Sequence, residues 1–161
     1  MTPKERAIAA LTLNVPDMVP TFELEFQLEE EMFGRKFITE DLTVEGLSKL
    51  SWKEKEKRIY QLAEYMVEVY STLEYSIIPG FVLGDARDFW RQGGTLPEET
   101  KLLIKYLREL VGENYMIHYH GDGTFSIPDG DQMYEFAYAI ADDREGVKER
   151  AAKMAKTAVE R

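Results

Sequence analysis

The sequence predicts an α/β fold, a partial (β/α)8 TIM barrel made of N-terminal strand–helix units with parallel strands. Predicted strands and helices alternate along the chain, which is typical of parallel sheets joined by right-handed crossovers. Neither GxGxxG nor GxxxxGK[ST] occurs, which disfavours an open nucleotide-binding sheet. A closed barrel needs about 250 residues, so a chain of 161 residues is too short to form a whole one.

Composition restricts the class of protein further. Hydrophobic residues make up 44 % of the chain and charged residues 31 %, which is enough apolar material for a core and excludes a disordered chain. Cysteine is absent, so disulfides, cysteine-ligated zinc, iron–sulfur clusters and thiol nucleophiles within the chain are excluded. The formal net charge of −10 would repel phosphate backbones, so no nucleic acid is expected as a partner.

The same sequence carries no sign of export or membrane insertion. No apolar run is long enough to span a bilayer, and residues 1–6 lack the apolar stretch of a signal peptide. The acidic residues are spread along predicted helices, as is typical of solvated helix faces. We therefore expect a cytoplasmic protein with no membrane partner.

The first predicted helix begins after Thr2, and the first predicted strand follows it. Pro3 suits the first helical position, Thr2 and Glu5 make a capping box, and residues 14–16 end the helix. Residues 19–26 alternate between two faces, which is the period of a strand. One face would carry Phe22, Leu24 and Phe26, and the other Thr21, Glu23 and Glu25.

Helices dominate the stretch that follows. Residues 27–33 have a helix-like composition, and a short helix is predicted within 44–50. The clearest helix runs over 51–73, since Ser51 and Glu54 make a second capping box and apolar residues recur at helical spacing. The remaining elements are predicted as a strand at 75–78, a glycine-rich loop at 79–95, a helix at 97–110, a strand at 115–120, and helices at 129–141 and 143–161.

Polar residues on the first and third predicted strands are the candidate catalytic and metal-binding groups. Glu23 and Glu25 share one face of the first strand, and a carboxylate buried there would need a partner or a metal. His118 and His120 form an HxH pair on the third strand, with Asp122 in the following loop. Their Cα atoms would lie about 7 Å apart on one side of the strand, and one divalent ion can bridge two imidazoles at that spacing. We therefore expect Glu25, His118 and Asp122 as catalytic groups, and Glu25, His118 and His120 as metal ligands.

The loops after the second and third strands supply candidate substrate-binding residues. Asp85 and Arg87 follow the second strand, where Arg87 would clamp a carboxylate or phosphate. Thr124 and Phe125 follow the third strand and would line a barrel mouth. With Glu23 from the first strand, they make up the expected site for a small-molecule substrate.

Each of these features also has a purely structural interpretation. The acidic face of residues 19–26 suits an edge strand whose side chains lie in water. The two histidines also suit hydrogen-bonded residues at a barrel rim, and Asp85 suits a helix cap in a surface loop. The residues alone leave open a metal-dependent hydrolase built on the HxH pair, and a non-catalytic chain that only binds a partner.

The N-terminal stretch MTPKERAIAALTLNVPDMVPTFELEF resembles the start of the uroporphyrinogen decarboxylase superfamily. The shared pattern is a short capped helix followed by a PDxVP turn, here within residues 14–20, that leads into the first strand. The stretch MIHYHGDGTFSIPDGDQM, residues 116–133, is similar to the family's strand–loop–helix at the active-site mouth. The resemblance runs along essentially the whole chain. It implies that residues 1–161 are the N-terminal half of such a barrel domain.

The superfamily contains porphyrinogen decarboxylases and cobamide-dependent methyltransferases. The decarboxylases carry an arginine-rich RQAGRYL-type segment after strand one, where this chain has residues 25–28, EFQL. The methyltransferase branch therefore resembles the chain better. This implies a methyl-corrinoid or methylated small molecule as substrate, with zinc and a corrinoid on a partner protein as cofactors. Porphyrinogen decarboxylation, a step of porphyrin biosynthesis, is the alternative.

The resemblance also implies zinc ligands and a second half of the barrel that this chain does not contain. The methyltransferases hold zinc with a His-x-Cys pair and a further Cys in the second half of the barrel, and this chain has no cysteine. We therefore expect a methyltransferase or a decarboxylase-type lyase only when a complementary half-barrel completes the site. An open half exposes sheet edges and an apolar face, so an oligomer is expected.

Overall fold

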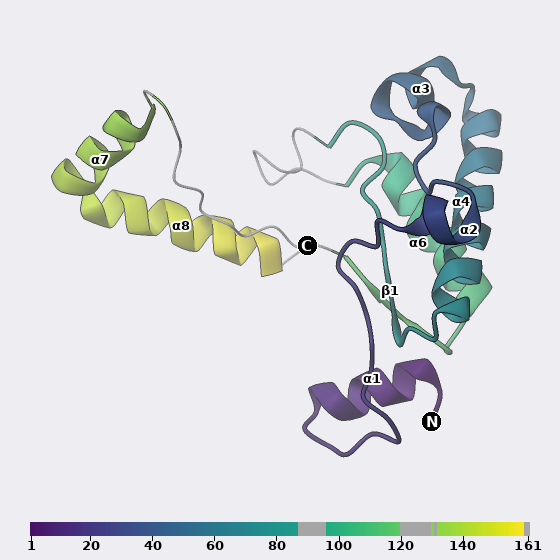
Figure 1. Cartoon of the computed structure of the whole chain (residues 1–161). Helices are drawn as coiled ribbons and strands as arrows, with labels where there is room; N and C mark the ends of the chain where they lie inside the picture. Colours follow the sequence, from purple (N-terminus) through teal and green to yellow (C-terminus); the bar gives the residue numbers. More distant parts are fainter. Residues whose placement is uncertain (87–95, 120–129, 131, 160–161) are drawn as a thin grey trace. The chain divides into compact units, whose positions relative to one another are not determined.

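The computed structural model describes residues 1–86, 96–119, 130 and 132–159. These residues belong to two compact units. The first unit contains residues 1–86 and 96–119, and the second contains residues 130 and 132–159. The order of the elements along both units can be followed in Figure 1. The first unit is mixed α/β, with mostly helices and one short sheet, so the predicted α/β class is confirmed at that level.

The first unit begins with the capped helix α1, Pro3–Leu11. The Thr2 hydroxyl accepts a hydrogen bond from the Glu5 backbone N–H at 3.1 Å, and the Glu5 carboxylate accepts one from the Thr2 backbone N–H at 2.8 Å. The predicted capping box is therefore confirmed. Short helices follow: α2 at Glu29–Phe33, the 3-10 helix η1 at Glu40–Leu42, and α3 at Val44–Lys49.

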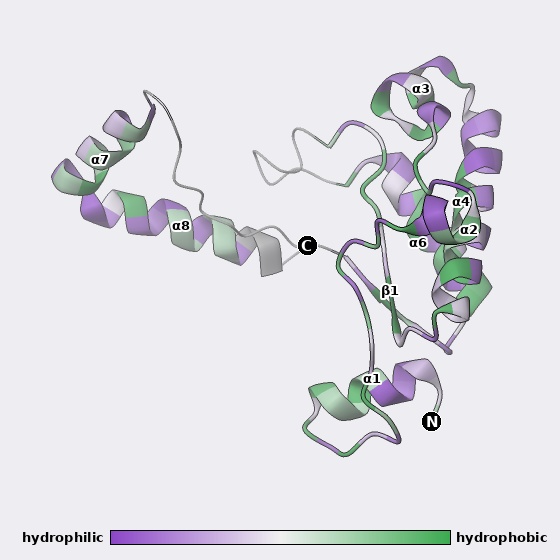
Figure 2. Ribbon diagram, in the orientation of Figure 1, coloured by the Kyte–Doolittle hydropathy of each residue, from purple (hydrophilic) through white to green (hydrophobic). Residues whose placement is uncertain are grey.

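The long helix α4, Trp52–Thr72, is confirmed with the predicted capping box of Ser51 and Glu54. It packs along α6, Glu98–Val111. The buried residues of α4 recur three or four positions apart, which gives the helix one apolar face. Figure 2 shows hydrophilic residues on α3 and α4 at the surface of this unit.

The sheet of the first unit consists of two parallel strands, β1 at Ile77–Pro79 and β2 at Met116–His118. In their register, Ile77 lies opposite Met116 and Pro79 opposite His118. Helix α6 lies between the strands in the sequence, so β1, α6 and β2 form a strand–helix–strand unit. The predicted parallel pairing of these two strands is confirmed.

The core lies where α4, α6 and β1 meet. Ile59 and Met66 of α4, Leu103 and Leu107 of α6, and Ile78 of β1 all have 0 % of their surface exposed. An ion pair of 2.6 Å between Lys55 Nζ and Glu99 Oε1 also joins the first turns of the two helices. The apolar faces predicted from helical spacing therefore pack against each other.

The predicted strand at 19–26 is wrong, because these residues adopt no strand. The segment runs beside the start of β1, where the Ser76 backbone N–H donates to the Thr21 carbonyl oxygen at 2.8 Å. Pro20 has no backbone N–H to donate, which weakens any ladder at this point. Phe26 is buried in the core, whereas Phe22 is half exposed. The alternation in the sequence thus reflects one anchored aromatic residue rather than a paired strand.

The second unit contains two helices that pack together, α7 at Gln132–Asp142 and α8 at Arg144–Val159. Asp143 caps α8, since its Oδ1 accepts a hydrogen bond from the Gly146 backbone N–H at 3.0 Å. Both predicted helices are confirmed, while the predicted start of the first of them, at residue 129, lies outside the described residues. Within the described residues of both units, no helix combines the length and apolar character that crossing a bilayer requires.

Candidate functional site

The carboxyl ends of β1 and β2 form the candidate site, because parallel α/β sheets place their functional groups there. The two ends are tied together where the Gly80 backbone N–H donates to the His118 carbonyl oxygen at 2.8 Å. His118 is the last residue of β2 and is half-buried. Its ring centroid lies 6.3 Å from that of Phe22, which comes from the segment before α2. The structure thus brings the end of β2 and the 19–26 segment together.

A close contact between Gly80 and Tyr119 fixes the shape of this edge. A Cβ atom at Gly80 would lie 2.0 Å from Cζ of Tyr119, so only glycine fits beside the ring. The Tyr119 hydroxyl is buried and has no hydrogen-bond partner in the part of the chain that the structure describes. Burial raises the pKa of this phenol, so it stays protonated and can donate.

Glu23 lies near a group of tyrosine side chains from the end of α4 and the segment that follows it. Its side chain is exposed but lies close enough to Tyr75 for its charge to raise the pKa of that phenol, after the larger effect of burial. Tyr75 packs against Tyr70, with ring centroids 5.6 Å apart. Tyr70 is fully buried, and its hydroxyl has no partner among the described residues. The predicted substrate residue therefore borders an aromatic cluster.

We expect Tyr70→Phe to raise the free energy of unfolding by about 1 kcal/mol, because it removes a buried hydroxyl with no partner. Tyr65→Phe is the matched control, since the Tyr65 hydroxyl donates to the Arg35 carbonyl oxygen at 2.5 Å. That change should lower the free energy of unfolding by about 1 kcal/mol. Urea denaturation followed by circular dichroism measures both. A loss of stability in Tyr70→Phe would contradict the expectation.

The loop after β1 is anchored to α6 by one side chain. Thr100 is fully buried, and its hydroxyl accepts from the Leu83 N–H at 2.9 Å and donates to the Leu83 carbonyl oxygen at 2.8 Å. Gly84 follows with a φ of +81°, which favours glycine. Asp85 comes next and is exposed. Thr100 therefore holds the backbone that carries this predicted substrate residue.

The predicted metal ligands lie only partly in the described residues. Glu25 is exposed and accepts a hydrogen bond from Gln27 Nε2 at 3.2 Å. Within the described ranges, no group of three or more His, Asp or Glu side chains is arranged to hold a metal ion. The other predicted site residues, His120, Asp122, Arg87, Thr124 and Phe125, lie outside the described residues. The metal set and the catalytic set that include them stay predictions.

Three residues of this edge were missed by the sequence analysis. Gly80 fell within the predicted loop at 79–95, and Tyr119 within the predicted strand at 115–120, without any sign that the two would touch. Thr100 gave no signal, because a threonine inside a predicted helix is common. Their roles depend on contacts between segments far apart in the sequence, which spacing does not reveal.

The chain was compared with known proteins at three levels. No protein-family model, curated protein or solved structure matches it. These comparisons therefore assign neither a family nor an activity to the chain.

Proposed function

We propose that the chain is the N-terminal half of a (β/α) barrel of the uroporphyrinogen decarboxylase superfamily, of the methyltransferase-like kind. Its substrate would be a methyl-corrinoid or a methylated small molecule. The observation that carries the proposal is the parallel β1–α6–β2 unit, with His118 at the carboxyl end of β2. Barrel enzymes of this class place their reacting groups at that end of the strands.

Two further features support the proposal that the chain is part of a (β/α) barrel. The capped helix α1 comes directly before the PDMVP stretch, in the order that the family resemblance implies. The segment after it runs beside β1 through the hydrogen bond from Ser76 to Thr21. In a barrel, a strand beside β1 would make a hydrogen bond of this kind. The segment occupies that place, although it is not a regular strand.

The family's zinc site does not fit this chain. Thiolate ligands are required for the His-x-Cys and Cys set, and the chain has no cysteine. We therefore derive no step through zinc from these residues. In the proposal, His118 and Glu25 shape and polarise the substrate pocket, and the corrinoid is carried by a partner protein.

Equilibrium dialysis of the chain against methylcobalamin tests the proposal. We expect saturable binding that weakens about tenfold or more in His118→Ala, since that change removes the polar group at the end of β2. Glu109→Gln, an exposed change on α6, should bind like the parent chain. Unaltered binding in His118→Ala, or no binding at all, would contradict the proposal.

Two parallel measurements separate the alternatives. Tighter binding of uroporphyrin than of methylcobalamin would favour a porphyrinogen decarboxylase. About one zinc ion per purified chain, lost in Glu25→Gln and in the double variant His118→Ala/His120→Ala, would favour a metal-dependent hydrolase.

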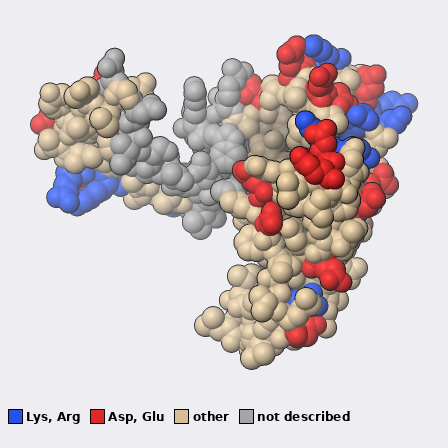
Figure 3. Space-filling model, viewed as in Figure 1, with Lys and Arg blue, Asp and Glu red and all other residues tan. Residues whose placement is uncertain are grey.

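A non-catalytic half that binds a complementary partner is favoured by one specific observation. Leu13, Val15 and Val19 have 95 %, 89 % and 79 % of their surface exposed. On the face drawn in Figure 3, few charged side chains cover α1 and the segment after it. Several highly exposed apolar side chains that lie close together in the sequence are typical of interaction surfaces. A chain that binds neither cobalamin nor porphyrin but forms a stable complex would have this role.

A further inference from the structure

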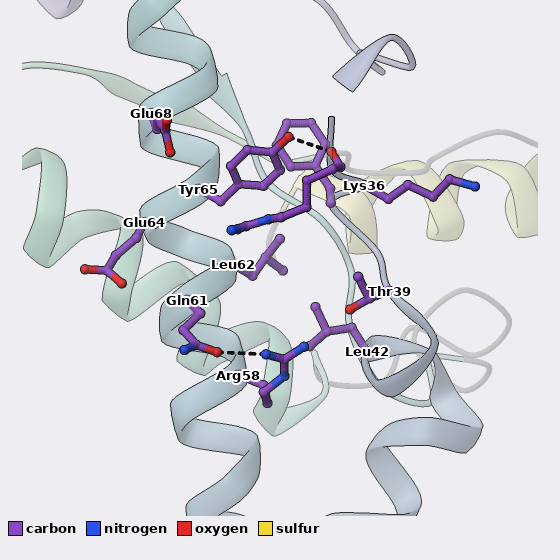
Figure 4. Close-up of a pocket in the computed structure, with 11 residues that line it drawn as sticks. Lys36, Thr39, Leu42, Arg58, Gln61, Leu62, Glu64, Tyr65 and Glu68 are labelled. Carbon is purple, nitrogen blue, oxygen red and sulfur yellow. Dashed lines mark hydrogen bonds between the residues drawn. The ribbon is translucent and has the colours of Figure 1, made fainter. Parts of the chain in front are cut away.

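A cavity of the first unit lies between α4 and the segment 35–42, and no residue of β1 or β2 lines it. Its volume is about 400 Å³, which is in the range of small-molecule sites. Apolar side chains of Phe37, Leu42 and Leu62 form part of its wall, and all three are almost fully buried. Figure 4 shows the α4 side chains that line it.

Arg35 is held in this cavity by Tyr65 at two points. The Tyr65 hydroxyl donates to the Arg35 carbonyl oxygen at 2.5 Å, which fixes the backbone. The Arg35 guanidinium carbon lies 3.7 Å from the centroid of the Tyr65 ring, which fixes the side chain. Stacking uses the face of the guanidinium and leaves its N–H groups available at the edge. A pre-positioned arginine of this kind suits a planar carboxylate that accepts two parallel hydrogen bonds.

The other cations of the cavity already have acidic partners. Arg58 donates to Asp41, and this contact lowers the pKa of that carboxyl to about 2. Lys36 pairs with Glu30 at 3.1 Å. Within the described residues, no carboxylate forms an ion pair with Arg35. Arg35 is therefore the one cation among the lining residues that has no such ion pair in the described part of the chain.

The acidic rim selects the charge of the ligand. Glu64 and Glu68 lie one helical turn apart on α4, and both line the cavity. Their negative charges would repel a phosphate dianion more strongly than a carboxylate monoanion. The apolar wall favours a ligand with a hydrocarbon body.

We propose that this cavity binds a small organic monocarboxylate, whose carboxylate pairs edge-on with Arg35 while its apolar body lies against Phe37, Leu42 and Leu62. The site is separate from the ends of β1 and β2, so it does not depend on the proposed methyltransferase-like role. In this proposal Arg35, an exposed residue that belongs to no recognisable sequence motif, binds the carboxylate of the ligand.

Isothermal titration calorimetry with hexanoate as the probe tests this proposal. We expect saturable binding that weakens about tenfold or more in Arg35→Gln, because the charge and both donors are removed. Arg35→Lys keeps the charge but not the planar fork, so its binding should fall between the two. Inorganic phosphate should bind about tenfold more weakly than hexanoate, or not at all.

Two controls test whether a loss of binding comes from Arg35 itself, rather than from a change in net charge or from unfolding. Lys101→Gln removes one exposed cation from α6 and should leave hexanoate binding unchanged. Arg35 is exposed, so Arg35→Gln should unfold at the same temperature as the parent chain, as followed by circular dichroism. Equal hexanoate binding in Arg35→Gln and the parent chain, no saturable binding, or phosphate binding as tight as hexanoate would each overturn the proposal.

Discussion

Gly80→Ala is expected to lower the free energy of unfolding by about 3 kcal/mol, because the new Cβ would overlap the Tyr119 ring. The nearest ring atom lies 2.0 Å from the Cβ position, far inside contact distance. The ring would have to leave its buried position, and its apolar surface would return to water. Urea denaturation followed by circular dichroism measures the loss.

A double-mutant cycle separates this clash from other effects. Tyr119→Ala removes the ring, so adding Gly80→Ala to it should cost far less than Gly80→Ala alone. Gly34→Ala is the comparison for backbone strain, because Gly34 has a φ of +73° and open space around it. That change should cost about 1 kcal/mol. Equal losses for Gly80→Ala with and without the Tyr119 ring would show that the clash is not the cause.

Thr100→Val is expected to lower the free energy of unfolding by about 2 to 4 kcal/mol, since it keeps the shape of the side chain and removes both hydrogen bonds to Leu83. The Leu83 N–H and carbonyl groups would then be left without their partner in a buried position. The loop after β1, with Asp85, would lose its attachment to α6. Urea denaturation measures the stability, and hydrogen exchange of the Leu83 amide measures the release of the loop.

Thr100→Ser is the matched control, because it keeps the hydroxyl and loses only a methyl group. It should lose no more than about 1 kcal/mol and keep the Leu83 amide protected. If Thr100→Val and Thr100→Ser cost the same, the methyl group rather than the hydrogen bonds would hold the loop.

The fold was predictable where the signals are local. The capping boxes at Thr2 and Ser51 and the helical spacing of α4 require only neighbouring residues, and the structure has them. The strand at 19–26 failed because alternation does not reveal whether a segment finds a hydrogen-bonding partner. Pro20 was the available signal against it, since it removes a backbone donor.

The candidate site was predictable only in part, for the same reason. His118 lies at the end of a strand as its sequence position indicated. Gly80 and Tyr119 meet only because β1 and β2 pair in parallel, and Thr100 reaches Leu83 only after α6 packs beside the sheet. Arg35 is an exposed arginine outside the helices, and its position depends on Tyr65 of α4. No spacing rule connects these pairs.

The parallel pairing of β1 and β2 also determines the order in which the first unit can form. All of α6 lies between the two strands, so their pairing must close a long loop first. Strands of three residues gain too little on their own to offset that loss of chain entropy. We therefore expect α4 and α6 to dock early and to provide the surface on which the strands pair late. By the same reasoning, we expect the edge that carries His118 to assemble last and to open first.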